Sequence, residues 1–126
     1  MFRLIHSEVH EILSDALQGK TKIYPVIYPQ NEGLPACIYT LEESTRAVTN
    51  ANSTTATSEH VFTILVFGRS FKEAHEITVD LINAIDQKAS NKHKIMGINV
   101  LSISDAFNPE NNSFVKTIQC QFTARG

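Results

Sequence analysis

The sequence is poor in the residues that most often mark a secreted scaffold or a nucleotide site. Its 126 residues include no tryptophan, two cysteines and five glycines. The cysteines, Cys37 and Cys120, lie in separate apolar runs, and we interpret them as buried thiols in a reducing compartment rather than as a disulfide. The glycines are scattered, so they do not form a glycine-rich loop that could cradle a phosphate.

Strong charge of one sign and long apolar runs are also missing. Charged residues make up 19% of the chain and the formal net charge is −2, whereas nucleic-acid-binding domains are usually strongly basic. No segment approaches the roughly 20 apolar residues of a membrane span, and the stretch MFRLIHSEVHEIL lacks the apolar centre of an export signal. We therefore expect no membrane partner, no general nucleic-acid binding, and a single domain over residues 1–126.

What is present is an orderly succession of helix and strand patterns. Apolar residues from Ile5 to Leu17 recur with the 3.6-residue period of a helix, and Gly19 is well placed to end it. A second helix is predicted from 71 to about 88, because Ser70 and Glu73 fit a capping box and apolar residues follow at helical spacing. Apolar, β-branched and alternating residues predict strands at 22–28, 36–42, 59–67, 98–107 and 114–124.

This order of elements favours an α+β fold, in which an antiparallel or mixed sheet of about five strands carries two helices packed on one face. Pro25 lacks an amide donor, so the first strand should lie at an edge of the sheet or be irregular. In the last strand, apolar residues alternate with Gln119, Gln121 and Thr123. This alternation predicts one packed face and one face that is solvated or lies against a partner.

Two loops supply the other candidate contact residues. The segment 45–58 (TRAVTNANSTTATS) is small, polar and aperiodic, and connections of this length are often functional or mobile. In the segment 28–40 (YPQNEGLPACIYT), two prolines restrict the residues before them and stiffen the entry into the second strand. Architecture and docking are both open uses of that segment. The candidate contact residues from these loops are Pro29, Asn31, Leu34, Thr49, Asn50, Asn52, Ser53, Thr54 and Thr55.

Residue types used in catalysis occur, but not in the arrangements that catalysis needs. His6 and His10 have the spacing of two metal ligands on a helix, yet the glutamate of the zincin motif is displaced and no third ligand is evident. Glu42 and Glu43 are neighbours on a strand, so their carboxylates should point to opposite faces. No nucleophile elbow is present. We therefore predict a protein that is not an enzyme, with no metal site and no cofactor.

A short basic run follows the second predicted helix. Lys88, Lys92, His93 and Lys94 lie just past its expected end, where positive charge offsets the negative end of the helix dipole. We favour this interpretation, with a loop that meets DNA in a channel as the alternative.

The layout as a whole has a counterpart among known families. A strand end at Tyr28-Pro29 is followed by Leu34-Pro35, the β-rich stretch Cys37-Ile38-Tyr39-Thr40, a long polar hairpin, and a capped helix that begins Ser70-x-x-Glu73-Ala74. This arrangement resembles the tail completion family of tailed bacteriophages and prophages, also called tail terminator or tail-to-head joining proteins.

The resemblance implies a structural virion protein without an active site. Such subunits assemble as a ring, typically hexameric, at the head-proximal end of the tail tube, where the ring stops polymerisation and docks to the head connector. The implied partners are copies of the chain itself, the tail tube protein and the head connector or neck protein, with DNA only passing through the channel. The implied location is the neck region of the virion tail, after assembly in the bacterial cytoplasm. We expect residues 49–58 to be mobile in the free subunit and to contact a neighbour or the tube.

Two other functions fit the same elements. A head-closure or neck adaptor protein would occupy a nearby place in the virion. A small-ligand-binding, ferredoxin-like regulatory domain would instead need a concave pocket with a few convergent polar groups.

Overall fold

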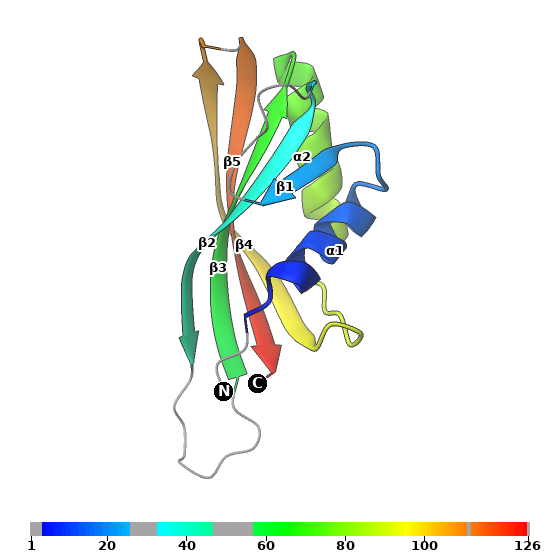
Figure 1. Ribbon diagram of the computed structural model, residues 1–126, viewed down its shortest axis with the longest axis vertical. Helices are drawn as coiled ribbons and strands as arrows, with labels where there is room; N and C mark the ends of the chain where they lie inside the picture. The colour runs from blue at the N-terminus through cyan, green and yellow to red at the C-terminus, as the bar shows by residue number, and fades with distance from the viewer. Residues whose placement is uncertain (1–3, 26–32, 47–56, 111, 126) are drawn as a thin grey trace.

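The computed structural model describes residues 4–25, 33–46, 57–110 and 112–125 (Figure 1). Within these residues, two helices and five strands follow one another in the predicted order. They are α1 (His6–Ala16), β1 (Lys22–Pro25), β2 (Ala36–Arg46), β3 (Thr57–Gly68), α2 (Phe71–Ile85), β4 (Ile95–Asn108) and β5 (Ser113–Arg125).

The five strands form one mixed sheet in the order β1-β2-β3-β5-β4. β1 pairs with β2 in parallel, and the other neighbours are antiparallel. The predicted α+β class and the mixed sheet are thus confirmed. Pro25 lies in an edge strand, as its missing amide donor predicts.

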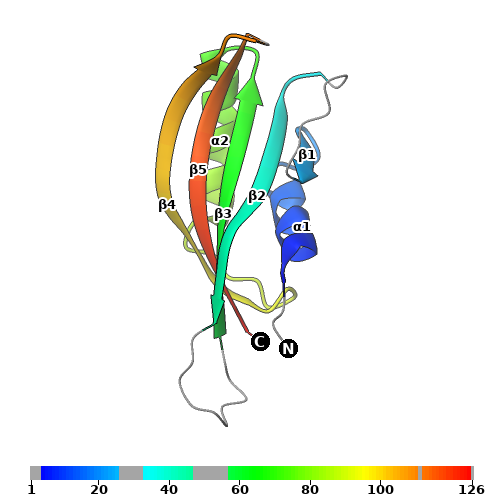
Figure 2. The ribbon, with the colours of Figure 1, turned by 60° about the vertical axis from the view of Figure 1, so that its left-hand side comes forward.

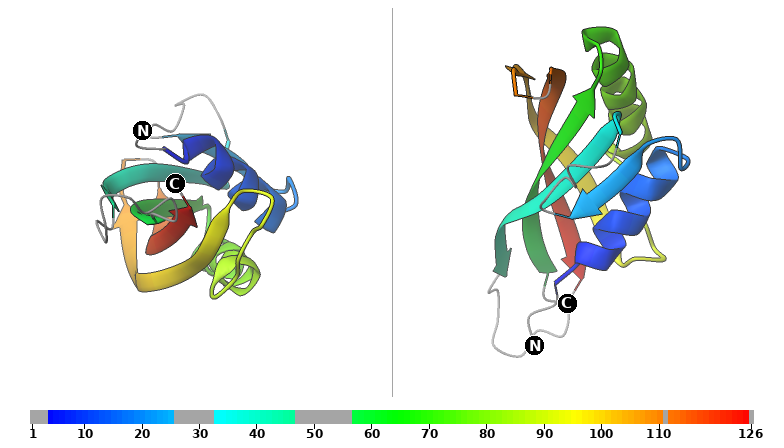
Figure 3. Two further views of the ribbon diagram at one scale, coloured as in Figure 1. Left: turned by 90° about the horizontal axis from the view of Figure 1, so that it is seen from below. Right: turned by 45° about the horizontal axis from the view of Figure 1, so that its top comes forward.

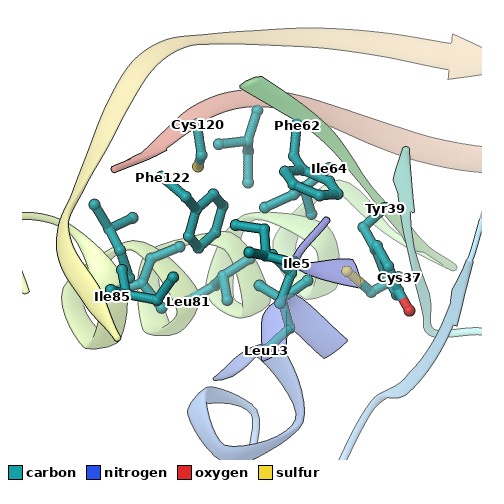
Figure 4. Packing of buried hydrophobic residues seen from close by; sticks show 14 of the residues in the cluster. Ile5, Leu13, Cys37, Tyr39, Phe62, Ile64, Leu81, Ile85, Cys120 and Phe122 are labelled. Carbon is teal, nitrogen blue, oxygen red and sulfur yellow. The ribbon is translucent and has the colours of Figure 1, made fainter. Parts of the chain in front are cut away.

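Both helices pack on the same face of the sheet, with α1 beside β1 and β2, and α2 over β3 and β5 (Figures 2 and 3). Between the helices and the sheet lies one main core (Figure 4). Fully buried side chains such as Phe62 and Phe122 point from the strands toward Leu13 of α1 and Leu81 of α2. The apolar stripes of the helices and the alternating residues of the strands therefore face one another, as their periods predict.

The elements differ from the sequence prediction mainly in length. α2 ends at Ile85, because Asp86 takes an extended conformation, with φ −64° and ψ 131°. The four longer strands extend past their apolar patterns, since backbone pairing continues where the side chains are polar. β2 and β3, for example, stay paired as far as Arg46 and Ser58.

The start of α2 follows the predicted capping pattern with one shift. The Ser70 hydroxyl accepts a hydrogen bond from the Glu73 amide at 3.1 Å. The Glu73 carboxylate accepts from the amide of Arg69 at 2.8 Å, one residue earlier than in a standard capping box.

Leu34 and Pro35, joined by a cis peptide bond, lead into β2. Leu34 packs on a second, smaller apolar cluster of Ile38, Phe67 and Val115. For this residue the structure shows packing that anchors the entry into β2.

Candidate assembly surface

Part of the sheet face that carries no helix is lined by uncharged polar side chains, beside the smaller apolar cluster of Ile38, Phe67 and Val115. In the strand register Thr40 lies opposite Thr63, Thr63 opposite Gln119, and Gln119 opposite Ser102. Rows on either side add further hydroxyl and amide groups. We call this the open face, and define it by Thr40, Thr63, Ser102, Ser104, Thr117, Gln119, Gln121 and Thr123.

Hydrogen bonds between side chains already link parts of the open face. The Ser102 hydroxyl donates to Oε1 of Gln119 at 3.5 Å, and the Thr63 hydroxyl donates to Oε1 of Glu42 at 2.8 Å. Glu42 lies at a register shift between Leu41 and Glu43. Because a bulge interrupts the alternation there, the simple expectation of opposite faces for Glu42 and Glu43 does not apply.

The structure brings three of the candidate contact residues together. Gln119 is exposed, and Gln121 and Thr123 are half-buried, all on the open face. Leu34 is half-buried in the smaller cluster described above. The remaining candidates lie outside the described residues: Pro29, Asn31, Thr49, Asn50, Asn52, Ser53, Thr54 and Thr55.

A second surface was not found from the sequence. On β4, Leu101, Ile103 and Phe107 are 51%, 48% and 50% exposed, and Phe71 at the start of α2 is 48% exposed. We call these four residues the apolar edge. The available signal was the apolar spacing in LSISDAF, but only the strand order places this strand at the rim of the sheet.

Beside the apolar edge lies a lysine on the packed face of β5. Lys116 is 7% exposed. Its ammonium group donates to Oδ1 of Asp105 at 2.7 Å and lies 4.7 Å from the centre of the Phe71 ring. An anion and an aromatic face compensate the burial of this charge, so β4 and the start of α2 are held to β5.

Three of the histidines contact other side chains of the fold. Nδ1 of His10 lies 3.1 Å from the Tyr39 hydroxyl, and the His6 ring meets the Phe62 ring edge-on. His60 is fully buried, and its two ring nitrogens lie 2.6 Å and 2.8 Å from the hydroxyls of Ser44 and Ser58. Over the described residues, no group of three or more His, Cys, Asp or Glu side chains could hold a metal ion.

Both cysteines are buried free thiols, as predicted. Burial raises the pKa of Cys37 and of Cys120 to about 12. Because the thiolate is the reactive form, neither side chain is suited to nucleophilic chemistry near neutral pH.

The basic run lies just past α2, whose own last turn contains no basic residue. The Lys92 ammonium donates to Oε1 of Glu11 on α1 at 2.7 Å. This hydrogen bond lowers the pKa of Glu11 below its ordinary value of 4.5. Lys92 thereby ties the connection between α2 and β4 to the first helix.

A hollow of about 450 Å³ lies between the end of α1 and the middle of α2. It is an open groove; of its polar lining residues Gln18, Lys20, Asp80 and Asn83 are exposed, and Thr21 is 6% exposed. They do not form the enclosed, convergent set that a small-ligand site needs. Neither helix in the described part of the chain is long and apolar enough to cross a membrane.

Comparison with known proteins gives a likeness in structure alone. No protein-family model matches this chain. No curated protein matches it either. Among solved structures, a chain from the "Virion of native gene transfer agent (GTA) particle" is similar over 90% of this chain and 84% of its own length, with a TM-score of 0.63 and 17% sequence identity. The two chains share a fold: a mixed sheet with both helices on one face.

Proposed function

We propose that this chain is a structural virion protein of a phage, prophage or phage-like particle. The observation that carries the proposal is the fold shared with a chain of a virion particle over 90% of this sequence. A structural role also fits the surfaces described above, which present neutral polar groups and apolar side chains rather than a site where reactive groups converge. In this role the chain transforms no molecule and uses no cofactor.

Within the virion, we assign it to the head-proximal end of the tail. There it forms a ring, typically a hexamer, that terminates the tail tube and joins it to the head connector. The layout of Tyr28-Pro29, Leu34-Pro35 and the capped α2 supports this assignment by its resemblance to tail completion proteins. A ring of identical subunits needs two different contact patches on each copy, and the apolar edge is suited to be one of them.

Deletion of the gene in a strain that produces the particles tests the assignment. We expect headless tails that are overlong or unfinished in negative-stain electron microscopy, and we expect a plasmid copy of the gene to restore their length. Finished tails of normal length beside heads that have lost DNA would instead identify a head-closure protein. Intact particles in normal yield would show that the chain has no role in virion assembly.

A further inference from the structure

β4 is a long edge strand whose exposed half has the properties of a contact surface. It lies at one end of the strand order, and every residue from Leu101 to Phe107 is exposed. A free edge offers backbone donors and acceptors to another strand, and proteins usually protect such edges with charges or proline. In this stretch the only charged residue is Asp105, which is engaged with Lys116. This edge is therefore poorly protected against pairing.

The helical layer also ends before it reaches this half of β4. Ile103 pairs with Ile118, and Phe107 with Phe114, so both point to the helix-bearing side of the sheet. They remain half-exposed because α2 lies mainly over β3 and β5. At the opposite edge of the sheet, α1 stands beside β1 on that same side (Figure 2). A copy placed edge to edge would bring its own β1 and α1 next to the uncovered apolar side chains.

The strand register makes this placement possible without a shift along the strands. One row runs from Ile23 of β1 through Cys37, Val66 and Lys116 to Asp105 of β4, and the adjacent row joins Lys22 to Ala106. β1 and the exposed half of β4 therefore occupy the same rows. From the pairing directions, β4 runs opposite to β1. Two copies in the same orientation would thus meet as an antiparallel pair.

The two edges also differ in charge. Exposed Lys20 lies just before β1, and exposed Glu110 lies just after the end of β4. A contact between the β4 edge and the β1 edge would bring these opposite charges close together, whereas a contact between two β4 edges would bring acidic groups close to each other. Complementary charges of this kind favour the correct partner over the wrong one.

We propose that copies of this chain associate head to tail, with residues 103–106 of β4 in one copy lying antiparallel to β1 (Lys22–Pro25) of the next. The contact covers the apolar edge and continues the sheet from copy to copy. The inference rests on the proposed ring, for which it supplies the two complementary patches. A contact between unlike patches generates a closed ring when its rotation closes.

Disulfide trapping in the full-length protein tests the contact. Lys22→Cys is combined in turn with Ala106→Cys and with Ser104→Cys, which covers the register above and a shift of two residues. Directly opposed residues in an antiparallel pair have Cα atoms within the range that a disulfide spans. After mild oxidation of purified protein and of assembled particles, we expect a ladder of dimer, trimer and larger species on non-reducing gels. Each single variant should stay monomeric, because Cys37 and Cys120 are buried.

Two outcomes would overturn the proposal. A covalent dimer from Ala106→Cys alone indicates a symmetric contact between two β4 edges. Absence of a ladder from both double variants, in the particles as well as in solution, excludes the β4–β1 contact. Tail length measured on gene deletion is a separate readout. A ladder without a tail defect rejects the proposed place in the tail, and a tail defect without a ladder rejects the contact.

A matched pair of surface variants adds an independent measurement. Ile103→Lys places a charge in the proposed contact, opposite Pro25 of the next copy, and we expect it to weaken self-association by at least about tenfold in sedimentation experiments. Val79→Lys changes a side chain that is 40% exposed on α2, away from both edges, and should associate like the unmodified protein. Equal association of both variants with the unmodified protein would count against β4 as the contact.

Discussion

Gly68 shows how a single residue sets the turn between the sheet and the second helix. It is the last residue of β3, and a Cβ atom added there would lie 2.6 Å from the backbone nitrogen of Ala74 and 3.0 Å from its Cα. Both are backbone atoms of a hydrogen-bonded first turn, so they cannot move aside easily. The close approach of α2 is the physical reason that no side chain fits at Gly68.

The variant Gly68→Ala should therefore reduce the free energy of unfolding by roughly 1–3 kcal/mol, since it forces the start of α2 away from β3. Gly97→Ala is the matched control, because nothing lies within 4 Å of a Cβ at that position of β4. We expect its stability to stay within about 0.5 kcal/mol of the unmodified protein. Urea unfolding curves of the two variants measure the difference. Similar losses of unfolding free energy for both variants would mean that the close approach of Ala74 is not the cause of the loss in Gly68→Ala.

Lys116 is a buried charged residue whose burial cannot be explained from the sequence of β5 alone. The alternation in β5 assigns Ile118, Cys120 and Phe122 correctly to the packed face. Lys116 follows the same alternation and is buried, although lysine alone predicts exposure. Its compensating groups, Asp105 and the Phe71 ring, come from two other elements. Only their meeting in space makes the burial of this charge acceptable.

At the scale of the elements, the start of α2 links protonation to stability. The backbone amide of Arg69, together with its guanidinium group, holds the pKa of Glu73 below its ordinary value of 4.5. Because the pKa is lowered in the folded state, the stabilisation is fully present above the unfolded pKa. It is lost as the pH falls through the folded pKa.

Glu73→Gln removes this carboxylate and should lower the free energy of unfolding at pH 7 by about 0.5–1 kcal/mol, as the loss of a capping interaction does. The difference from the unmodified protein should shrink once the pH falls below about 4.5, because the native carboxyl group is then protonated as well. Glu76→Gln, one turn further along, alters an exposed pair with Lys72 at 3.9 Å and should change little at any pH. Thermal unfolding between pH 3 and pH 7 measures the stability of both variants and of the unmodified protein. If the difference in unfolding free energy between Glu73→Gln and the unmodified protein did not vary with pH, this account would be contradicted.

The elements themselves were largely accessible from local pattern. Both helices and all five strands exist in the predicted order, because periods of 3.6 and 2 residues report which side of an element is apolar. Their ends were less accessible, since pairing carries β2 and β4 beyond the residues whose side chains show the pattern. The parallel pairing of β1 with β2 could not be predicted from the sequence either, because it depends on where the chain returns after the intervening loop.

At the scale of the whole molecule, the sheet has two unlike edges and one face without a helix. This asymmetry is what an assembling subunit needs, and it is the basis of the two proposals above. Of the predicted contact residues, the open face gathers Gln119, Gln121 and Thr123, for which strand alternation was sufficient evidence. The apolar edge was missed, because a local pattern does not reveal which strand lies at the rim.

The proposed ring makes a prediction for the connection between β2 and β3. Thr57 and Ser58, which the sequence assigned to this mobile segment, belong to β3, and Ser58 is fully buried. Residues 49–56 should gain protection from hydrogen exchange when free subunits assemble, because a neighbour or the tail tube then covers their backbone amides. The interior of β3 around Phe62 and Ile64 serves as the internal reference, since it is buried in the single subunit and should be protected in both states. Equal protection of residues 49–56 in the free and assembled states would show that this segment is not part of the interface.

By itself, the amino-acid sequence determined the local elements, the packed and open sides of the last strand, the buried thiols and the α+β class. Each follows from the period of apolar residues along a short stretch of chain. Only the tertiary structure decided the strand order, the exposed rim at β4, the Lys92–Glu11 pair and the burial of Lys116. These depend on residues that are distant in the chain, up to 81 positions apart in the case of Glu11 and Lys92. Their meeting is decided by how the whole sheet packs against its helices, which no local period encodes.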